Sequence, residues 1–199
     1  RPITMSTEKQ SRIYAGRLLS VGLLGGSPEW TAALRRHPAA VVAVAAALTA
    51  CACVPYAGFP ALCLAALLCG GFYADCEPLE LLLLPETGAA RLLARKTFTA
   101  WRNYFLLAAP FALLTVSAHP RSAWMAAAWV PFAALALFYF VAAKYARYEP
   151  DRTPRLPLAA KLGTAGFLVP PLLPLTLCLT VSYAFRAERN LNRYLHDYD

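Results

Sequence analysis

The chain has 199 residues, of which 59% are hydrophobic and 15% are charged. Soluble domains are typically about 45–50% apolar and about 25% charged, so this composition argues against a soluble globular enzyme and against a disordered chain. The formal net charge is +8, which would suggest nucleic acid in a soluble protein but in a membrane protein marks loops on the cytoplasmic or matrix side.

The N-terminal segment, residues 1–37, has the pattern of a membrane-surface region. A helix starting at Ser6 or Thr7 would carry apolar residues on one face and basic residues elsewhere, as in amphipathic helices that lie along a membrane. A soluble helix packed against a partner fits the same pattern equally well. Ser27 at an N-cap position and Pro28 at the first helical position then predict a second, short helix.

Four long apolar stretches follow, and each is predicted to cross a membrane: 38–54, 60–74, 97–118 and 123–143. A membrane-spanning helix needs about 20 apolar residues, so the first two stretches are barely long enough and form a tight, uncharged hairpin. Gly70 and Gly71 in this hairpin would allow close contact with other helices. The fourth stretch has aromatic residues towards both ends, as in the aromatic belts of membrane proteins: Trp124, Trp129, Phe138, Tyr139 and Phe140.

A fifth apolar stretch, residues 156–185, is too long for one straight span and is interrupted by Pro170, Pro171 and Pro174. Proline breaks or kinks a helix, so the stretch forms either one bent helix that crosses once or two half-helices that turn back as a hairpin. The sequence therefore predicts an all-α integral membrane protein of about four to six transmembrane helices. Its segments are an N-terminal amphipathic, interfacial region, a polytopic transmembrane domain and a polar tail: 1–37, 38–185 and 186–199.

The basic residues indicate an orientation. The sequence has 19 Lys and Arg residues, and all except Arg121 fall in four segments: 1–37, 75–102, 144–161 and 186–199. Basic loops stay on the cytoplasmic or matrix side, which places the N-terminus and both charged loops there. The tail joins them only if residues 156–185 form a hairpin, which is therefore the preferred alternative. The expected location is a bacterial cytoplasmic membrane or the mitochondrial inner membrane.

Residues 75–96 differ from the apolar stretches on both sides. Acidic residues come first and basic residues follow, and Pro85 and Gly88 are expected to break the segment into two short helices. The segment is too charged to span a membrane and too apolar for a solvated loop, so we expect it to lie at the interface and to dock a partner. Plain interfacial helices with solvated charges are an equally weighted alternative. The candidate partner-docking residues are Glu77, Glu80, Pro85, Glu86, Arg91, Arg95 and Lys96.

Residues 72–114 resemble the permease subunits of type-2 ATP-binding-cassette exporters. The matching positions run from an acid-rich start through Glu-x-Leu into a proline and on to Leu-x-x-Lys: Glu77, Glu80, Leu81, Pro85, Leu93 and Lys96. The resemblance implies that this segment is a coupling element seated on a separate ATPase subunit and that the N-terminal helix is the family's elbow helix. Two features depart from the family, which usually has six spans: fewer spans are counted here, and the chain has no G-x-x-x-x-G-K-[ST] motif.

The chain shows no pattern of a catalytic or cofactor site. Its histidines, His37, His119 and His196, are far apart, and no paired carboxylates or Ser-His-Asp arrangement is evident, so we expect no enzyme activity, no metal and no cofactor. The expected partners are a separate ATPase subunit or other membrane subunits and the lipid bilayer, in a homo- or hetero-oligomer, and not nucleic acid.

One alternative function stays open beside the exporter subunit. It is a non-catalytic accessory or structural subunit of a multisubunit membrane complex, such as a mitochondrial respiratory or ATP synthase assembly. The absence of an initiator Met and of charges deep in the spans favours this alternative. The acid-then-base segment, residues 75–96, favours the exporter.

Overall fold

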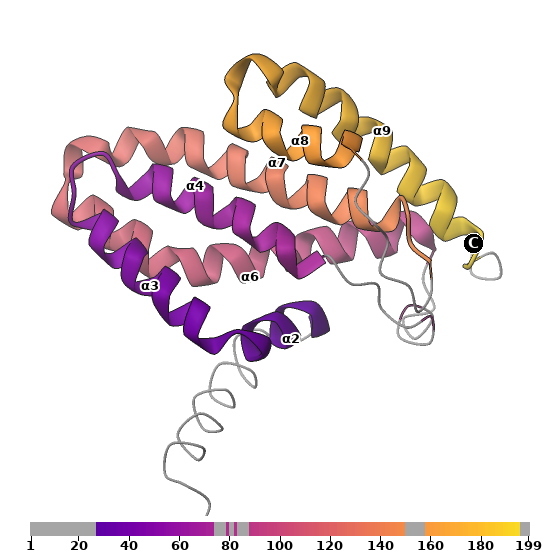
Figure 1. Cartoon of the computed structure of the whole chain (residues 1–199), viewed down its shortest axis with the longest axis horizontal. Helices are drawn as coiled ribbons and strands as arrows, with labels where there is room; N and C mark the ends of the chain where they lie inside the picture. Colours follow the sequence, from indigo (N-terminus) through magenta and orange to yellow (C-terminus); the bar gives the residue numbers. More distant parts are fainter. Residues whose placement is uncertain (1–26, 74–78, 80–81, 83–87, 150–157, 196–199) are drawn as a thin grey trace, which may run out of the picture.

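The computed structural model describes residues 27–73, 79, 82, 88–149 and 158–195, and this part of the chain is helical with no β-strand (Figure 1). The predicted all-α class is thereby confirmed. The predicted amphipathic helix near the N-terminus lies outside the described residues. The elements in chain order are α2 (Pro28–Arg36), α3 (Pro38–Ala52), α4 (Gly58–Leu68), η1 (Cys69–Tyr73), α6 (Ala89–Ala118), η2 (Pro120–Met125), α7 (Ala126–Tyr145), α8 (Leu158–Leu168), η3 (Pro170–Leu172) and α9 (Leu173–Asn192).

The helix boundaries follow local signals that are visible in the sequence. α2 begins at Pro28 directly after Ser27, as predicted, and Glu29 in its first turn complements the positive end of the helix dipole. Gly88 is the N-cap residue of α6, which confirms the predicted break at this glycine. The 3-10 turn Pro170–Leu172 separates α8 from α9 at the prolines where the sequence predicts an interruption.

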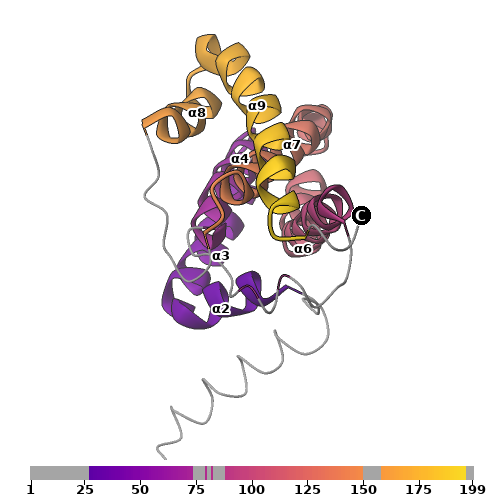
Figure 2. The ribbon, with the colours of Figure 1, turned by 90° about the vertical axis from the view of Figure 1, so that its right-hand side faces the viewer.

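α7 lies at the centre of the bundle and packs against α4, α6 and α9 (Figures 1 and 2). Two hydrophobic clusters meet along it. One contains Trp30 and Phe59 and joins α2, α4, α6 and α7, and the other contains Tyr139 and Tyr183 and joins α6, α7, α8 and α9. α3 lies at the edge of the bundle, and among its residues Ala52 alone is buried.

The two ends of the bundle differ in charge. At one end, which we name the Glu29 end, Glu29 of α2 contacts lysines of α6 and α7. At the opposite end, the His119 end, Nε2 of His119 lies 3.1 Å from the backbone oxygen of Cys53. Arg121 lies at the His119 end, in the 3-10 turn that directly follows His119. The predicted placement of the basic residues on one side of a membrane stays a prediction.

α8 and α9 form a hairpin that begins and ends towards the Glu29 end (Figure 1). Phe167 of α8 stacks edge-to-face on Phe132 of α7, with ring centroids 5.5 Å apart. α9 then returns, and the Asn190 amide donates a 3.1 Å hydrogen bond to the backbone oxygen of Tyr145. The proline-broken stretch is therefore a hairpin, as preferred above. Because α9 continues to Asn192, the expected start of the polar tail lies inside this helix.

The third apolar stretch belongs to a longer helix than predicted. α6 begins at Ala89 rather than at Thr97, so the basic half of residues 75–96 forms the first turns of one continuous helix of 30 residues. The prediction of a separate short helix after Gly88 is wrong. The residues Ala89–Lys96 are Ala, Leu, Arg and Lys, which are all good helix formers, so nothing ends the helix before the apolar stretch begins.

The aromatic residues of the fourth stretch do not form two belts. Trp129, Tyr139 and Phe140 are buried in the core, whereas Trp124 is 68% exposed at the His119 end. The rings of Trp129 and Phe59 are 5.8 Å apart, since this face of α7 packs against α4. These side chains therefore hold the bundle together, and the predicted belt arrangement is wrong for all three.

One helical segment of the described residues, Pro120–Tyr145 with 26 residues, is long and apolar enough to cross a membrane. The apolar helices Pro38–Ala52 and Gly58–Tyr73 are shorter, and α6 carries four basic residues in its first half. The central helix of a soluble protein passes the same test of length and hydropathy. Helix length and hydropathy therefore do not support the predicted number of four to six spans.

Candidate functional site

A cluster of buried charges occupies the Glu29 end. The Nζ atoms of Lys96 and Lys144 lie 3.1 and 3.4 Å from the same oxygen, Oε1 of Glu29. The side chains of Glu29 and Lys144 are 5% and 1% exposed, and that of Lys96 is 18% exposed. Each of the three charges comes from a different helix, namely α2, α6 and α7, so the cluster ties these helices together.

Polar and aromatic groups complete the surroundings of this Glu29 cluster. The Ser27 hydroxyl donates a 3.0 Å hydrogen bond to Oε2 of Glu29, so the N-cap residue of α2 orients the carboxylate. The Lys144 Nζ lies 5.9 Å from the ring centroid of Tyr73 and 5.5 Å from that of Tyr145, distances at which a cation is attracted to a ring face. The indole of Trp30 donates a 2.9 Å hydrogen bond to the Tyr73 hydroxyl.

The energetic character of the Glu29 cluster follows from its burial. Moving charges out of water costs several kcal/mol per ion, which only close opposite charges and hydrogen bonds can offset. Glu29 supplies one negative charge to two lysines, so removing it would break a contact of each. The arrangement is suited to holding α2 against α6 and α7. Among the described residues, no group of three or more His, Cys, Asp or Glu side chains is placed to hold a metal ion.

The predicted docking residues divide into three groups. Arg91 and Arg95 are exposed on the first turns of α6, one turn apart on the same helix face. Lys96, which follows them directly, is half-buried and paired with Glu29. Four of the predicted residues lie outside the described part of the chain: Glu77, Glu80, Pro85 and Glu86. The structure thus pairs the half-buried Lys96 with Glu29 and leaves two arginines on the surface beside it.

The sequence did not reveal Glu29 and Lys144 as partners. Glu29 resembles an ordinary first-turn acid and Lys144 an ordinary base after an apolar stretch, and the two are 115 positions apart. Lys144 directly follows a long uncharged segment, whereas Glu29 is separated from the first apolar stretch by Arg35 and Arg36. A single sequence gives no means of pairing such distant residues.

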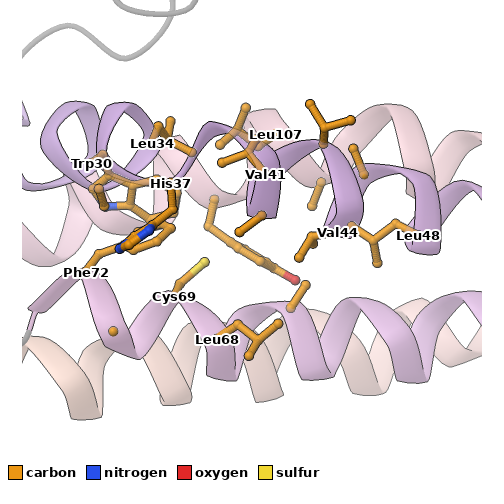
Figure 3. A pocket seen from close by; sticks show the side chains of 18 of the residues that line it. Trp30, Leu34, His37, Val41, Val44, Leu48, Leu68, Cys69, Phe72 and Leu107 are labelled. Atoms are coloured by element: carbon orange, nitrogen blue, oxygen red, sulfur yellow. The ribbon is translucent and has the colours of Figure 1, made fainter. Parts of the chain in front are cut away.

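A second feature near the Glu29 end is an apolar groove of about 920 Å³ (Figure 3). α3 forms one wall with Val41, Val44 and Leu48, and α4 with η1 forms the other wall with residues that include Leu68. α6 contributes Leu107 to the lining. The groove exists because α3 contacts α4 and α6 without filling the space between them with large side chains.

Comparison with protein-family models, with curated proteins and with solved structures finds no match for this chain. The likeness of residues 72–114 to exporter permeases therefore stays a prediction that rests on the residues named above.

Proposed function

We propose that the chain is a membrane-embedded subunit in which α3, α4 with η1, α6 and α7 cross the bilayer and the α8–α9 hairpin enters it from the Glu29 end. One observation carries this proposal: large apolar side chains face outwards all around the bundle. Val42 is 68% exposed on α3 and Leu113 69% exposed on α6, and the same holds for side chains of α4, α7 and α9: Leu64, Val130 and Val181. Soluble monomers rarely expose apolar surface of this extent.

Three buried threonines of the bundle support the same proposal by their inward positions. Thr115, Thr176 and Thr180 are buried, and each donates its hydroxyl to a backbone oxygen in its own helix or a neighbouring one. A bilayer provides no water to satisfy such groups, so polar side chains in spans turn inwards and bond within the protein. The Glu29 end, with its many bases, would then face the cytoplasm or matrix.

We further propose that this subunit belongs to an ATP-driven export complex and docks a separate ATPase through residues 75–96. The support is the continuity of α6, which presents Arg91 and Arg95 at the surface and runs without a break to the His119 end. Lys96 adds a second connection, because its contact with Glu29 links the same turn of α6 to α2. A load applied at the surface arginines would thus reach α2 and the full length of α6.

Charge reversal tests the docking proposal. The double variant Arg91→Glu/Arg95→Glu should lose an ATPase subunit that co-purifies with the wild-type chain in mild detergent, because two attractive contacts become repulsive. Arg121→Glu, at the opposite end of the bundle, is the matched control and should keep the subunit. Undiminished co-purification with the double variant would refute docking at this surface.

A second candidate function is supported by the outer face of α3. Ala39, Ala43, Ala46 and Ala50 are exposed and recur at intervals of three or four residues, so they form a smooth stripe along the helix. Small residues at such spacing let membrane helices approach closely. This surface suits a structural subunit that packs against other membrane proteins. Co-purification of respiratory or ATP synthase subunits, and not of the ATPase subunit of an exporter, would support this function.

A further inference from the structure

We propose that the groove between α3 and α4 binds one phospholipid with an anionic headgroup, its acyl chains along the groove and its headgroup at the junction of α2 and α3. The inference rests on the proposed membrane embedding and is independent of ATPase docking. The groove opens beside α3, in which Ala52 is the one buried residue, so bilayer lipid has direct access to it.

The walls of the groove call for a hydrocarbon occupant. Its lining is almost entirely aliphatic or aromatic (Figure 3), and the polar atoms on its aromatic residues already have partners. The Tyr104 hydroxyl donates a 2.7 Å hydrogen bond to the backbone oxygen of Leu62 and accepts one of 3.0 Å from the Trp129 indole. The Trp30 indole is bonded to Tyr73. An acyl chain demands no hydrogen bonds and gains by burial, so it fits these walls.

One end of the groove is polar and positively charged. Arg36 and His37 line it there, together with Glu29, and Arg35 is exposed on the same turn of α2. The carboxylate of Glu29 contacts both Lys96 and Lys144, so the residues named at this end, all from the described part of the chain, include more basic than acidic side chains. A positive end followed by an uncharged groove is complementary to an anionic amphiphile, because a basic residue at a membrane surface attracts an anionic headgroup.

The volume of the groove is that of a small-molecule site. The groove has about 920 Å³, which lies within the range of about 300–1,000 Å³ that is usual for such sites. Flexible acyl chains can enter such a groove without separating α3 from α4.

Lipid retention tests the proposal. The full-length chain is placed in nanodiscs of equal phosphatidylglycerol and phosphatidylcholine with identical acyl chains, washed with detergent and examined by native mass spectrometry. We expect one phosphatidylglycerol to remain on each wild-type chain. Ala45→Phe/Ala65→Phe fills the groove from both walls and should lower retention at least about tenfold, since displacing two methylene groups already costs about that factor. The control Ala47→Phe, on the outer surface of α3, should retain the lipid.

A headgroup variant keeps the test decisive if the phenylalanine variant fails to fold. Arg36→Gln changes an exposed side chain and should lower the preference for phosphatidylglycerol about fivefold, the factor expected for one basic residue at a membrane surface. Arg35→Gln, its neighbour outside the lining, should have a smaller effect. Three results would each overturn the proposal. They are equal losses with Arg36→Gln and Arg35→Gln, retention by Ala45→Phe/Ala65→Phe equal to that of the wild type, and a wild-type chain, monomeric or dimerised, that keeps no lipid. Release of the chain from membranes by alkaline carbonate would instead show that the proposed membrane embedding had failed.

Discussion

α3 and α7 are both Ala-rich apolar helices, yet they occupy opposite environments in the bundle. α7 buries an unbroken run from Tyr139 to Tyr145, whereas α3 buries Ala52 alone. The difference lies in side-chain size rather than in hydropathy. α7 supplies rings that contact neighbouring helices, among them Trp129 and Tyr139, while α3 has no aromatic residue and consists mainly of Ala and Val. α3 and α7 have similar hydropathy, but the large aromatic side chains of α7 bury it in the core.

The largest expected effect comes from breaking the ion pair that connects α7 to α2, the helix that precedes α3. Glu29 lies on α2, which leads directly into α3, and Lys144 lies in the last turn of α7. Glu29→Ala removes the buried carboxylate that Lys96 and Lys144 both contact, and we expect it to lower the free energy of unfolding by about 3–5 kcal/mol. Unfolding by SDS in mixed micelles measures this change.

The control for this variant is Glu188→Ala, at a half-buried position of α9 outside the Glu29 cluster, which should change stability by about 0.5 kcal/mol or less. Glu29→Leu/Lys144→Met replaces the buried pair with apolar groups and should recover most of the lost stability. If Glu29→Ala were no more destabilising than Glu188→Ala, the cluster would not join α2 to α7.

The next largest effect concerns the surroundings of α3. Ala46 lies exposed at the middle of this helix, and Ala46→Arg should reduce membrane insertion by about 2.5–3.5 kcal/mol, the cost of a charge at the centre of a span. Ala39→Arg is the control, because a long side chain near the helix end reaches the interface at lower cost. A glycosylation-based insertion assay compares the two. Equal and negligible effects would show that α3 does not face lipid.

The helix boundaries could be predicted from the sequence, because they depend on nearby residues. Ser27 and Pro28 predicted the start of α2, Gly88 the break before α6 and Pro170–Leu172 the turn of the hairpin, because each acts through its own backbone. The apolar stretches likewise predicted where the helices of the bundle lie. Local signals therefore sufficed for the order and approximate limits of the described helices.

The rest depends on contacts between distant residues, which one sequence does not reveal. The pairing of Glu29 with Lys144 joins α2 to the end of α7, and neither residue is unusual in its own helix. The aromatic residues of α7 fit a membrane belt and a core equally well until the rotation of the helix is known, and Trp129 turned out to face α4. Lys96 was expected at a docking surface because its contact with Glu29 of α2 also joins residues far apart in the sequence.

A pair of adjacent glycines sharpens the comparison further. A Cβ added at Gly70 would lie 2.7 Å from the Phe140 ring of α7, whereas one added at Gly71 would meet nothing within 4 Å. Gly70→Ala should therefore destabilise the chain by about 1–3 kcal/mol through overpacking against α7. Gly71→Ala is the control and should stay within about 0.5 kcal/mol of the wild type. Similar values for both, measured in mixed micelles, would contradict the close approach of η1 to α7.

The smallest expected effect comes from the hydrogen bonds that join the centre of the bundle. The Tyr104 hydroxyl of α6 contacts the Leu62 backbone oxygen of α4 and the Trp129 indole of α7. Tyr104→Phe removes two hydrogen bonds, each worth about 0.6 kcal/mol if the bundle lies in a membrane as proposed, and should lower the free energy of unfolding by about 1 kcal/mol. Tyr56→Phe, at an exposed hydroxyl in the turn that follows α3, should have no measurable effect. A loss of several kcal/mol for Tyr104→Phe would mean that α7 is held in the core by polar contacts rather than by the packing of its aromatic rings.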